Sequence, residues 1–261
     1  MPTRIDNSDS PEIGWPEIGW IEVGEEFAAR LGCRPGKVPN SLASAQQILE
    51  AWMTGTQILS PVTLAGSVEV FDFTLGYDAS RPLLKPFGIG RYDEDRRGMY
   101  TSRLFTAEAD PRTIHVGIDI GASEGTPVFA PRPARVWGKA YLDAAGDYGG
   151  TLILETEISI RNRPGFRPVF MLFGHLSKLS VSRCAVGEEV QQGDLLGWLG
   201  GKKENGGWNP HLHWQLSFLE PMKHDLPGAV SKRNHELAKL VFPDPTRLLH
   251  RALNGWHRID I

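Results

Sequence analysis

The sequence predicts an all-β protein of antiparallel strands with small helical extensions at both ends. Two observations predict this class. Between Pro61 and Phe218, apolar and polar side chains alternate in short runs, which is the pattern of strands that bury one face. The chain also has 29 glycines and 19 prolines among its 261 residues, and these residue types favour turns between strands. Helical periodicity is absent between Thr113 and Phe218.

Three parts of the chain are expected. Residues 1–60 form a partly helical accessory segment, residues 61–220 form the β domain, and residues 221–261 form a loop with a helical tail. In the first part, Glu25–Leu31 is long enough for about two helical turns. Asn40 or Ser41 can cap a second helix that ends near Thr56. One face of that helix is apolar and is expected to pack on the β domain, through Ala45, Ile48, Leu49 and Trp52.

The β domain is expected to contain many short strands. They are expected at Val68 and Val70, Phe71–Leu75, Tyr100–Phe105, Val128–Ala130, Ala134–Trp137, Thr151–Ile160, Val169–Phe173, Leu195–Leu199 and His211–Phe218. In the tail, a helical pattern runs from Glu236 to Leu253 and is interrupted by Pro243 and Pro245.

Composition and charge exclude several classes of protein. The chain has 28 Lys and Arg against 31 Asp and Glu, and its formal net charge of −3 argues against a nucleic-acid partner. The longest wholly apolar run, Val169–Phe173, is far too short to cross a membrane. Cys33 and Cys184 lie far apart in sequence, which excludes a disulfide framework and an all-cysteine zinc site.

The amino-terminal residues are polar and acidic, without the basic start and apolar stretch of a secretory signal. A cytoplasmic protein is therefore expected. Residues 11–15 and 16–20 repeat the pentapeptide Pro-Glu-Ile-Gly-Trp, which we interpret as a local duplication in a linker.

The first motif with chemical potential is Thr113–Ile120. Strand alternation puts four apolar side chains on one face, namely Ile114, Val116, Ile118 and Ile120. His115, Gly117 and Asp119 fall on the other face. In a straight strand His115 and Asp119 are about 13 Å apart at Cα, which is barely within reach of one shared ion. Gly117 can bend the strand and bring both side chains to that ion.

Two further histidine motifs lie in the β region. In Pro210–Leu216, the side chains of His211, His213 and Gln215 share one face of a strand. The two imidazoles can serve one ion, or one can bind it while the other contacts substrate. His175 stands at the end of an apolar strand, in Phe-Gly-His-Leu. We expect the remaining histidines at the surface, namely His224, His235, His250 and His257.

Two histidines and one carboxylate suit zinc, and three protein ligands leave the fourth position open for water. Bound zinc lowers the pKa of that water to about 7, which provides a hydroxide nucleophile at neutral pH. The spare histidines would orient the water and stabilise the oxyanion. The loop Gly200–Trp208 and the turn Gly146–Gly150 are expected to rim the cleft, with Trp208 either packing or contacting substrate.

These motifs resemble those of the lysostaphin/LytM-type zinc endopeptidases. That family carries His-x-x-x-Asp, then Tyr/Phe-x-His-Leu, then His-Leu-His-aromatic. This chain has His115–Asp119, Phe173–Leu176 and His211–Trp214 in the same order. Gly125–Pro131 and Val186–Gly193 also match, so the resemblance covers about residues 88–218.

The resemblance implies a fold of the barrel-sandwich-hybrid type and one zinc ion per chain. It assigns the zinc to His115, Asp119 and His213, and it makes His175 and His211 the catalytic pair. The implied activity is cleavage of peptide bonds in bacterial peptidoglycan.

The chain also departs from the family pattern. Phe173 replaces a frequent Tyr, Asn209 replaces the Gly before Pro-His-Leu-His, and Gln215 replaces the Glu after the aromatic residue. Asn205–Gln215 and Phe242–Pro245 are similar to a branch whose domain is fused, in large cytoplasmic proteins, between a kinase-like domain and a class III aminotransferase. That similarity implies kinase-like and aminotransferase partners.

The leading prediction is a zinc metallohydrolase that cleaves a peptide or amide bond, possible substrates being peptidoglycan fragments. The alternative is a non-catalytic or repurposed cytoplasmic domain that binds or acts on a small amide metabolite, and metal content distinguishes the two. A cupin-like dioxygenase would need a glutamate soon after the second histidine, and Glu220 is poorly spaced for that role.

Overall fold

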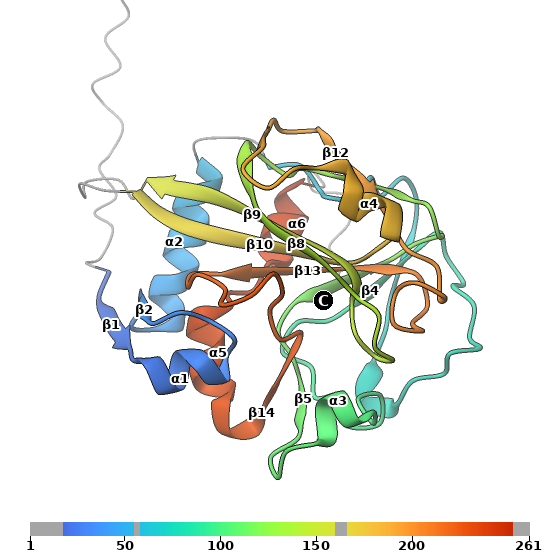
Figure 1. Cartoon of the computed structure of the whole chain (residues 1–261), viewed down its shortest axis with the longest axis horizontal. Helices are drawn as coiled ribbons and strands as arrows, with labels where there is room; N and C mark the ends of the chain where they lie inside the picture. Colours follow the sequence, from blue (N-terminus) through green and yellow to red (C-terminus); the bar gives the residue numbers. More distant parts are fainter. Residues whose placement is uncertain (1–17, 55–57, 160–165, 253–261) are drawn as a thin grey trace, which may run out of the picture.

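The computed structural model describes residues 18–54, 58–159 and 166–252, so the pentapeptide repeat up to residue 17 lies outside the described residues (Figure 1). It confirms an all-β fold. The main sheet has eight strands in the order β11-β8-β9-β10-β13-β6-β4-β3. Neighbouring strands are antiparallel, as expected, except that β3 pairs with β4 in parallel.

The strands of this sheet differ greatly in length. In chain order they are β3 (Val68–Val70), β4 (Phe87–Gly90), β6 (Ile118–Gly121), β8 (Ala134–Leu142), β9 (Gly149–Ser159), β10 (Phe166–Leu176), β11 (Glu189–Val190) and β13 (His211–Ser217). Three two-stranded sheets join β1 (Trp20–Val23) to β2 (Gly36–Pro39), β7 (Pro127–Phe129) to β12 (Leu195–Trp198), and β5 (Arg112–His115) to β14 (Ala229–Ser231).

The helices are short and lie around the sheet (Figure 1). They are α1 (Glu25–Arg30), α2 (Leu42–Thr54), α3 (Arg103–Thr106), α4 (Lys178–Arg183), α5 (His235–Val241) and α6 (Thr246–Ala252), with 3-10 turns η1 (Phe73–Leu75) and η2 (Lys232–Asn234). The Ser41 hydroxyl accepts a hydrogen bond from the Ser44 backbone at 3.1 Å, which confirms the expected cap of α2. Among the described residues, no helix is long and apolar enough to span a membrane.

The central strand β10 is buried on both faces from Val169 onward. Val169, Met171 and Phe173 enter one hydrophobic cluster, which we call the first core, whereas Phe170 and Leu172 enter another, the second core. Strands covered on both faces read as continuous apolar runs rather than as alternating ones. This burial explains why the longest apolar run of the sequence falls here.

The segments at both ends of the described chain supply the covering layers. In the first core, Ile48, Leu49 and Trp52 of α2 and Leu248 and Leu249 of α6 pack on the sheet. In the second core, the covering residues include Val23, Ala28, Leu31 and Val38 from the early segment and Ala238, Val241 and Phe242 from the tail. The cores therefore combine strand residues with residues from both extensions.

Three local expectations were wrong. Phe71–Leu75 is not a strand, because the Asp72 carboxylate accepts from the Thr74 backbone at 3.1 Å and caps η1. Tyr100–Phe105 is not a strand either, because the chain turns into α3 after Ser102. A helix between Thr113 and Phe218 was not expected. The Ser177 hydroxyl accepts from the Ser180 backbone at 3.3 Å and begins α4 there.

Candidate metal centre

The stretch that carries His115 and Asp119 is broken between two strands. β5 ends at His115 and pairs with β14, whereas β6 begins at Ile118 and pairs with β13 and β4. The expectation of one shared apolar face was therefore wrong. Two of its four members, Ile114 and Val116, enter the second core, and the other two, Ile118 and Ile120, enter the first.

Gly117 lies at this break, where a bend was expected. A Cβ atom placed on Gly117 would lie 2.5 Å from Cε1 of His213, which is closer than carbon atoms approach without displacement. The absence of a side chain at Gly117 therefore gives the His213 imidazole its place beside the chain break.

The structure brings His115, Asp119 and His213 together. His213 stands opposite Asp119 in the β13–β6 pair. His115 Nε2 lies 3.2 Å from Asp119 Oδ1, His213 Nδ1 lies 3.1 Å from the same oxygen, and the two nitrogens are 3.0 Å apart. All three residues are buried. These three atoms form a nearly equilateral triangle, which we call the ligand triangle.

The dimensions of the ligand triangle fit a zinc ion. Zinc bonds to histidine nitrogen and carboxylate oxygen measure about 2.0–2.2 Å in tetrahedral sites, so neighbouring ligand atoms are about 3.3 Å apart. The observed edges of 3.0–3.2 Å are close to that value. The donor set of two imidazoles and one carboxylate is also typical of zinc.

Each histidine of the triangle has a partner on its other ring nitrogen. His115 Nδ1 lies 2.7 Å from the Arg91 carbonyl oxygen, and His213 Nε2 lies 2.9 Å from Gln215 Oε1. If these nitrogens donate, the lone pairs of His115 Nε2 and His213 Nδ1 face the triangle. Gln215 thus provides the acceptor at the position where the sequence departs from the usual glutamate.

The electrostatics of the site favour the protonation states that metal binding needs. Burial raises the pKa of Asp119, but His115, the Arg96 guanidinium and hydrogen bonds outweigh it and hold that pKa well below its usual value. Burial, together with the charge of Arg96, lowers the pKa of His115 to about 4. At neutral pH the site therefore presents an ionised carboxylate and a neutral imidazole.

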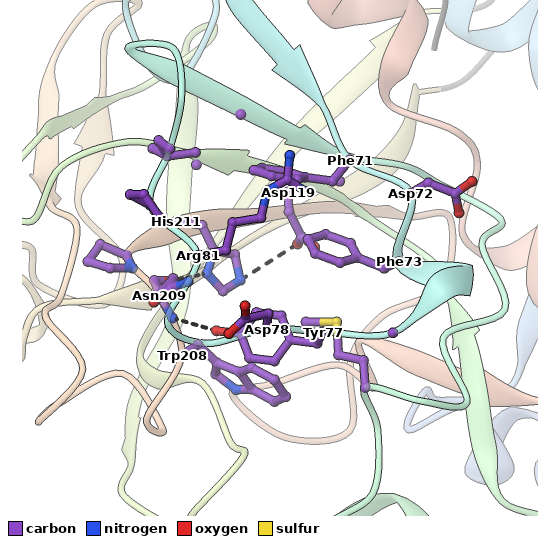
Figure 2. A pocket seen from close by; sticks show the side chains of 18 of the residues that line it. Phe71, Asp72, Phe73, Tyr77, Asp78, Arg81, Asp119, Trp208, Asn209 and His211 are labelled. Carbon is purple, nitrogen blue, oxygen red and sulfur yellow. Dashed lines mark hydrogen bonds and ion pairs between the residues drawn. The ribbon is translucent and has the colours of Figure 1, made fainter.

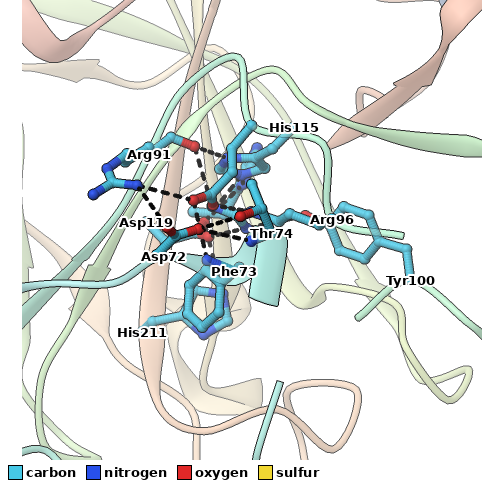
Figure 3. Close-up of polar contacts among 11 residues, drawn as sticks. Asp72, Phe73, Thr74, Arg91, Arg96, Tyr100, His115, Asp119 and His211 are labelled. Atoms are coloured by element: carbon cyan, nitrogen blue, oxygen red, sulfur yellow. Dashed lines mark hydrogen bonds and ion pairs between the residues drawn. The ribbon is translucent and has the colours of Figure 1, made fainter. Parts of the chain in front are cut away.

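Arg96 is a site residue that the sequence did not reveal. Figure 3 shows the polar contacts around it. Its side chain is fully buried, and Nη1 lies 2.6 Å from Asp119 Oδ2 and 3.1 Å from the Tyr100 hydroxyl. Its Nε donates to Glu94 at 2.8 Å. Arg91–Gly98 reads as a charged loop in the sequence, and nothing there distinguishes Arg96 from its exposed neighbour Arg97.

The other two predicted histidines lie beside the triangle. The rings of His175 and His211 are 4.2 Å apart between centroids. His175 Nδ1 lies 3.0 Å from the Asn205 carbonyl oxygen and His211 Nδ1 lies 2.7 Å from the Asn209 carbonyl oxygen. Carbonyl oxygens only accept, so each Nδ1 carries the proton and each Nε2 is left as a base. His211 Nε2 lies 3.8 Å from Asp119 Oδ1.

A bulge in β10 aims His175 into the site. The pairing of β10 with β9 is irregular between Phe173 and Leu176, and His175 has a φ of 62°. This left-handed conformation is rare for residues other than glycine and costs about 1–2 kcal/mol. Burial, followed by His211, lowers the pKa of His175 well below its usual value, and burial also lowers that of His211.

Tyr148 is the second site residue that the sequence did not single out, although it belongs to the turn expected at the rim. The centroid of its ring lies 5.2 Å from the ring centroid of His175 and 5.3 Å from that of His213. Its hydroxyl is buried and has no hydrogen-bond partner among the described residues. The ring fits closely, because a Cβ on Gly174 would lie 2.5 Å from it and a Cβ on Gly228 would lie 2.4 Å from its hydroxyl oxygen.

The two loops expected at the rim do line a small cavity at the site. Gly146, Tyr148 and Trp208 border it together with His175, His211 and His213. The other histidines lie elsewhere: His224 is exposed against Trp137, and His235 is paired with Asp93. His250 lies in α6, and His257 is outside the described residues.

Comparison with known proteins agrees with this site. The sequence model of peptidase family M23 matches residues 113–224. A Haemophilus influenzae protein that bears the name uncharacterized metalloprotease is 29% identical over 153 residues, which are 55% of this chain and 29% of the relative. The chain therefore covers less than a third of that relative's length.

Two solved structures match parts of the chain. The catalytic domain of the antimicrobial peptidase lysostaphin from Staphylococcus simulans is 25% identical, over 52% of this chain and 80% of that chain, with a TM-score of 0.34. A zinc-containing peptidase from Vibrio cholerae is 25% identical, over 44% of this chain and 32% of that chain, with a TM-score of 0.31. The stretch that matches the M23 family model contains the ligand triangle, His175 and His211.

Proposed function

We propose that the chain is a zinc-dependent hydrolase of peptide or amide bonds in which His115, Asp119 and His213 hold the metal. The observation that carries this proposal is the ligand triangle, with edges of 3.0–3.2 Å. Beside it lie two further imidazoles whose Nδ1 atoms donate to backbone carbonyls, which leaves each Nε2 as a base. The match to peptidase family M23 over residues 113–224 supports it.

When bound, zinc supplies Lewis acidity, which lowers the pKa of a water to about 7 and polarises the scissile carbonyl. The chain supplies the proton transfers. Nε2 of His175 or His211 accepts the proton that the attacking water loses and delivers it to the nitrogen of the leaving amine. The Nδ1 bonds to the Asn205 and Asn209 carbonyls hold both rings in the tautomer that this step needs.

Tyr148 is placed to stabilise the charge that develops on the substrate. Its buried hydroxyl is an uncommitted donor that borders the same cavity as His175 and His211. Burial raises its pKa well above the usual value, so the hydroxyl stays protonated at neutral pH. A donor fixed in this way can bond to the carbonyl oxygen as it becomes an oxyanion.

The substrate we propose is a peptide, and its origin in peptidoglycan stays a prediction from the resemblance. The H. influenzae relative is named as a metalloprotease and the S. simulans neighbour as an antimicrobial peptidase. A kinase-like or aminotransferase partner remains a prediction from the sequence.

The test is metal analysis on protein purified without chelators or metal-affinity resin, before and after addition of zinc. We expect about one zinc per chain, lost in Asp119→Ala and His213→Ala. His175→Ala and His211→Ala should keep zinc and lose hydrolysis, while the exposed His224→Ala should keep both. Full activity in both His175→Ala and His211→Ala would refute the proton-transfer role. If no zinc binds even after resupply, the binding-module alternative is favoured.

A further inference from the structure

A second and larger cavity opens beside the ligand triangle. It has a volume of about 750 Å³, and Asp119 and His211 border it (Figure 2). Cavities of about 300–1,000 Å³ are typical of binding sites for small molecules and short peptide segments. Because it reaches His211, a group bound in it lies next to the bond that the proposed function would cleave.

The wall of this cavity is aromatic. Phe71 and Phe73 stack with centroids 5.2 Å apart, Phe73 contacts Tyr77 at 6.1 Å, and Tyr77 contacts Trp208 at 5.6 Å. Trp208 borders both this cavity and the smaller one around His175. The lining also contains the apolar side chains of Leu75, Pro82, Leu83, Met99 and Pro210.

The charged side chains of the wall are engaged in its own structure. Arg81 alone among the described lining residues is an arginine or lysine, and it pairs with Glu69 while its guanidinium lies 5.1 Å from the centre of the Phe71 ring. The Asp72 and Asp78 carboxylates accept hydrogen bonds from the turns that they cap, at Thr74 and Ser80. The described lining therefore offers no uncommitted lysine or arginine to an anionic group, whereas its aromatic rings offer contacts to apolar ones.

Most of this wall lies outside the stretch that matches family M23. The rings at positions 71, 73 and 77 come from the segment between β3 and β4, well before residue 113 where that match begins. The Tyr77 hydroxyl accepts from the Asn209 backbone at 3.1 Å, which ties the segment to the loop that precedes His211. The segment between β3 and β4 thus contacts the loop that leads into the candidate centre.

We propose that this aromatic cleft binds a bulky apolar side chain of the substrate, next to the scissile bond, and so selects peptides with Leu or Phe there over peptides with Gly or Glu. The inference rests on the proposed function for its cleavage arm only. Leu75, which is 87% exposed at the cleft, is then an entry contact rather than a stray surface residue.

Binding can be tested without catalysis. The probes are fluorescein-labelled hexapeptides Ala-Ala-X-Y-Ala-Ala. In each peptide one of the two positions X and Y is Gly, Leu, Phe, Lys or Glu and the other is Ala. Their binding to the metal-free full-length protein is measured by fluorescence anisotropy. We expect a Leu or Phe peptide to bind at least about tenfold more tightly than the Gly peptide, because a large apolar side chain gains free energy when it leaves water for the aromatic wall. Equal binding of all the peptides, or tighter binding of the Glu or Lys peptide, would overturn the inference.

Variants locate the effect. Tyr77→Ala and Leu83→Ala should each reduce the Leu-over-Gly preference to about threefold or less, since each removes part of the wall. Tyr77→Phe loses the bond from the Asn209 backbone but keeps the ring, so it should keep most of the preference. Leu84→Ala, a neighbour that is 74% exposed and outside the lining, is the matched control. Unchanged preference in both Ala variants, with thermal unfolding showing them folded, would contradict the assignment to this cleft.

The cleavage arm uses the zinc-loaded protein and the same peptides, with kcat/KM measured from quenched fluorescence. Preferred cleavage beside Leu or Phe supports both proposals. Selective binding without cleavage would support the role of the cleft and contradict the proposed hydrolase. Cleavage with no preference for X or Y would support the hydrolase and contradict the role of the cleft.

Discussion

The buried guanidinium of Arg96 shows how much of the candidate centre depends on one residue outside the predicted set. It bonds to Asp119 Oδ2, on the side of the carboxylate away from the ligand triangle. A buried arginine is stable only with its charge compensated, and Glu94 and Asp119 provide that compensation. The same contact fixes the orientation of the carboxylate.

We expect Arg96→Met to lower the free energy of unfolding by about 3–5 kcal/mol, since it leaves two buried carboxylates without their partner. Zinc affinity should fall by about 10- to 100-fold, because the partner that orients a metal ligand is lost. Chemical denaturation and competition with a zinc indicator measure the two effects. The control is Arg97→Met, whose side chain is 62% exposed and pairs with Asp95. Equal effects in the two variants would contradict the role of Arg96.

Tyr148→Phe tests the uncommitted hydroxyl. We expect kcat to fall by about 100-fold, as for loss of one oxyanion donor. Zinc content and unfolding temperature should not fall, because the hydroxyl has no partner among the described residues to lose. Tyr92→Phe is the matched control: it loses a 2.7 Å bond to the Phe242 carbonyl, so it should lose about 1 kcal/mol of stability and no activity. Unchanged kcat in Tyr148→Phe would remove the residue from the mechanism.

At the scale of elements, two loops hold the second pair of histidines in place. The Gly146 backbone donates to the Gly206 carbonyl at 2.8 Å, and the neighbouring Asn205 carbonyl is the acceptor for His175. A Cβ on Gly206 would lie only 1.9 Å from the Asp147 carbonyl oxygen. The close approach of these loops therefore needs glycine at this position.

Gly206→Ala should separate the loops and lower kcat by at least about tenfold through His175, while zinc affinity changes less than about twofold, because the ligand triangle is held by other strands. Gly207→Ala is an adjacent control. Gly207 has a φ of 92°, close to the 82° of Gly206, but a Cβ there would meet nothing within 4 Å. Its substitution should therefore show the conformational cost of about 1–2 kcal/mol alone. An equal fall in kcat in the two variants would show that backbone strain, and not the contact between the loops, causes the loss.

Elements with a continuous pattern were predicted well, and those decided by side-chain caps were not. The strand expected at His211–Phe218 is β13, and the helix expected after Ser41 is α2. The turns at Asp72 and Ser177 depend on single hydrogen bonds between side chain and backbone, which apolar periodicity does not report.

The candidate site, like the fold, was predictable only in part. The sequence motifs and the family resemblance supplied His115, Asp119, His175, His211 and His213, and the structure brings these five side chains together, although the strand alternation expected around His115 and Asp119 was wrong. Arg96 and Tyr148 could not be found, because their importance arises from burial and from partners that lie far away in sequence.

At the scale of the whole molecule, the early segment and the tail are joined to each other as well as to the sheet. Arg34 donates to the Glu220 carbonyl and Met222 donates to the Gly32 carbonyl, each at 2.8 Å. Cys33, between these bonds, is fully buried in the second core, and burial raises the pKa of its thiol to about 12.

Cys33 therefore reports whether this junction opens. In a Cys184→Ser variant at pH 8, we expect a disulfide reagent to label native Cys33 at least about a thousandfold more slowly than the unfolded chain, because burial excludes the reagent and suppresses the thiolate. Labelling is followed by absorbance with and without denaturant. A Cys33→Ser variant gives the matching rate for Cys184, which is also buried. Rapid labelling of native Cys33 would mean that the junction opens readily.

The burial of β10 on both faces depends on residues outside the part of the chain that resembles other proteins. The unit that similarity detects spans residues 113–224, but Phe170 and Leu172 are covered on their side by residues from before and after that span. Cutting the chain at the edges of the detectable likeness would strip the sheet of its outer layers. The likeness thus covers the candidate centre and its strands, whereas the layers that keep water from both faces of the sheet come in part from residues outside it.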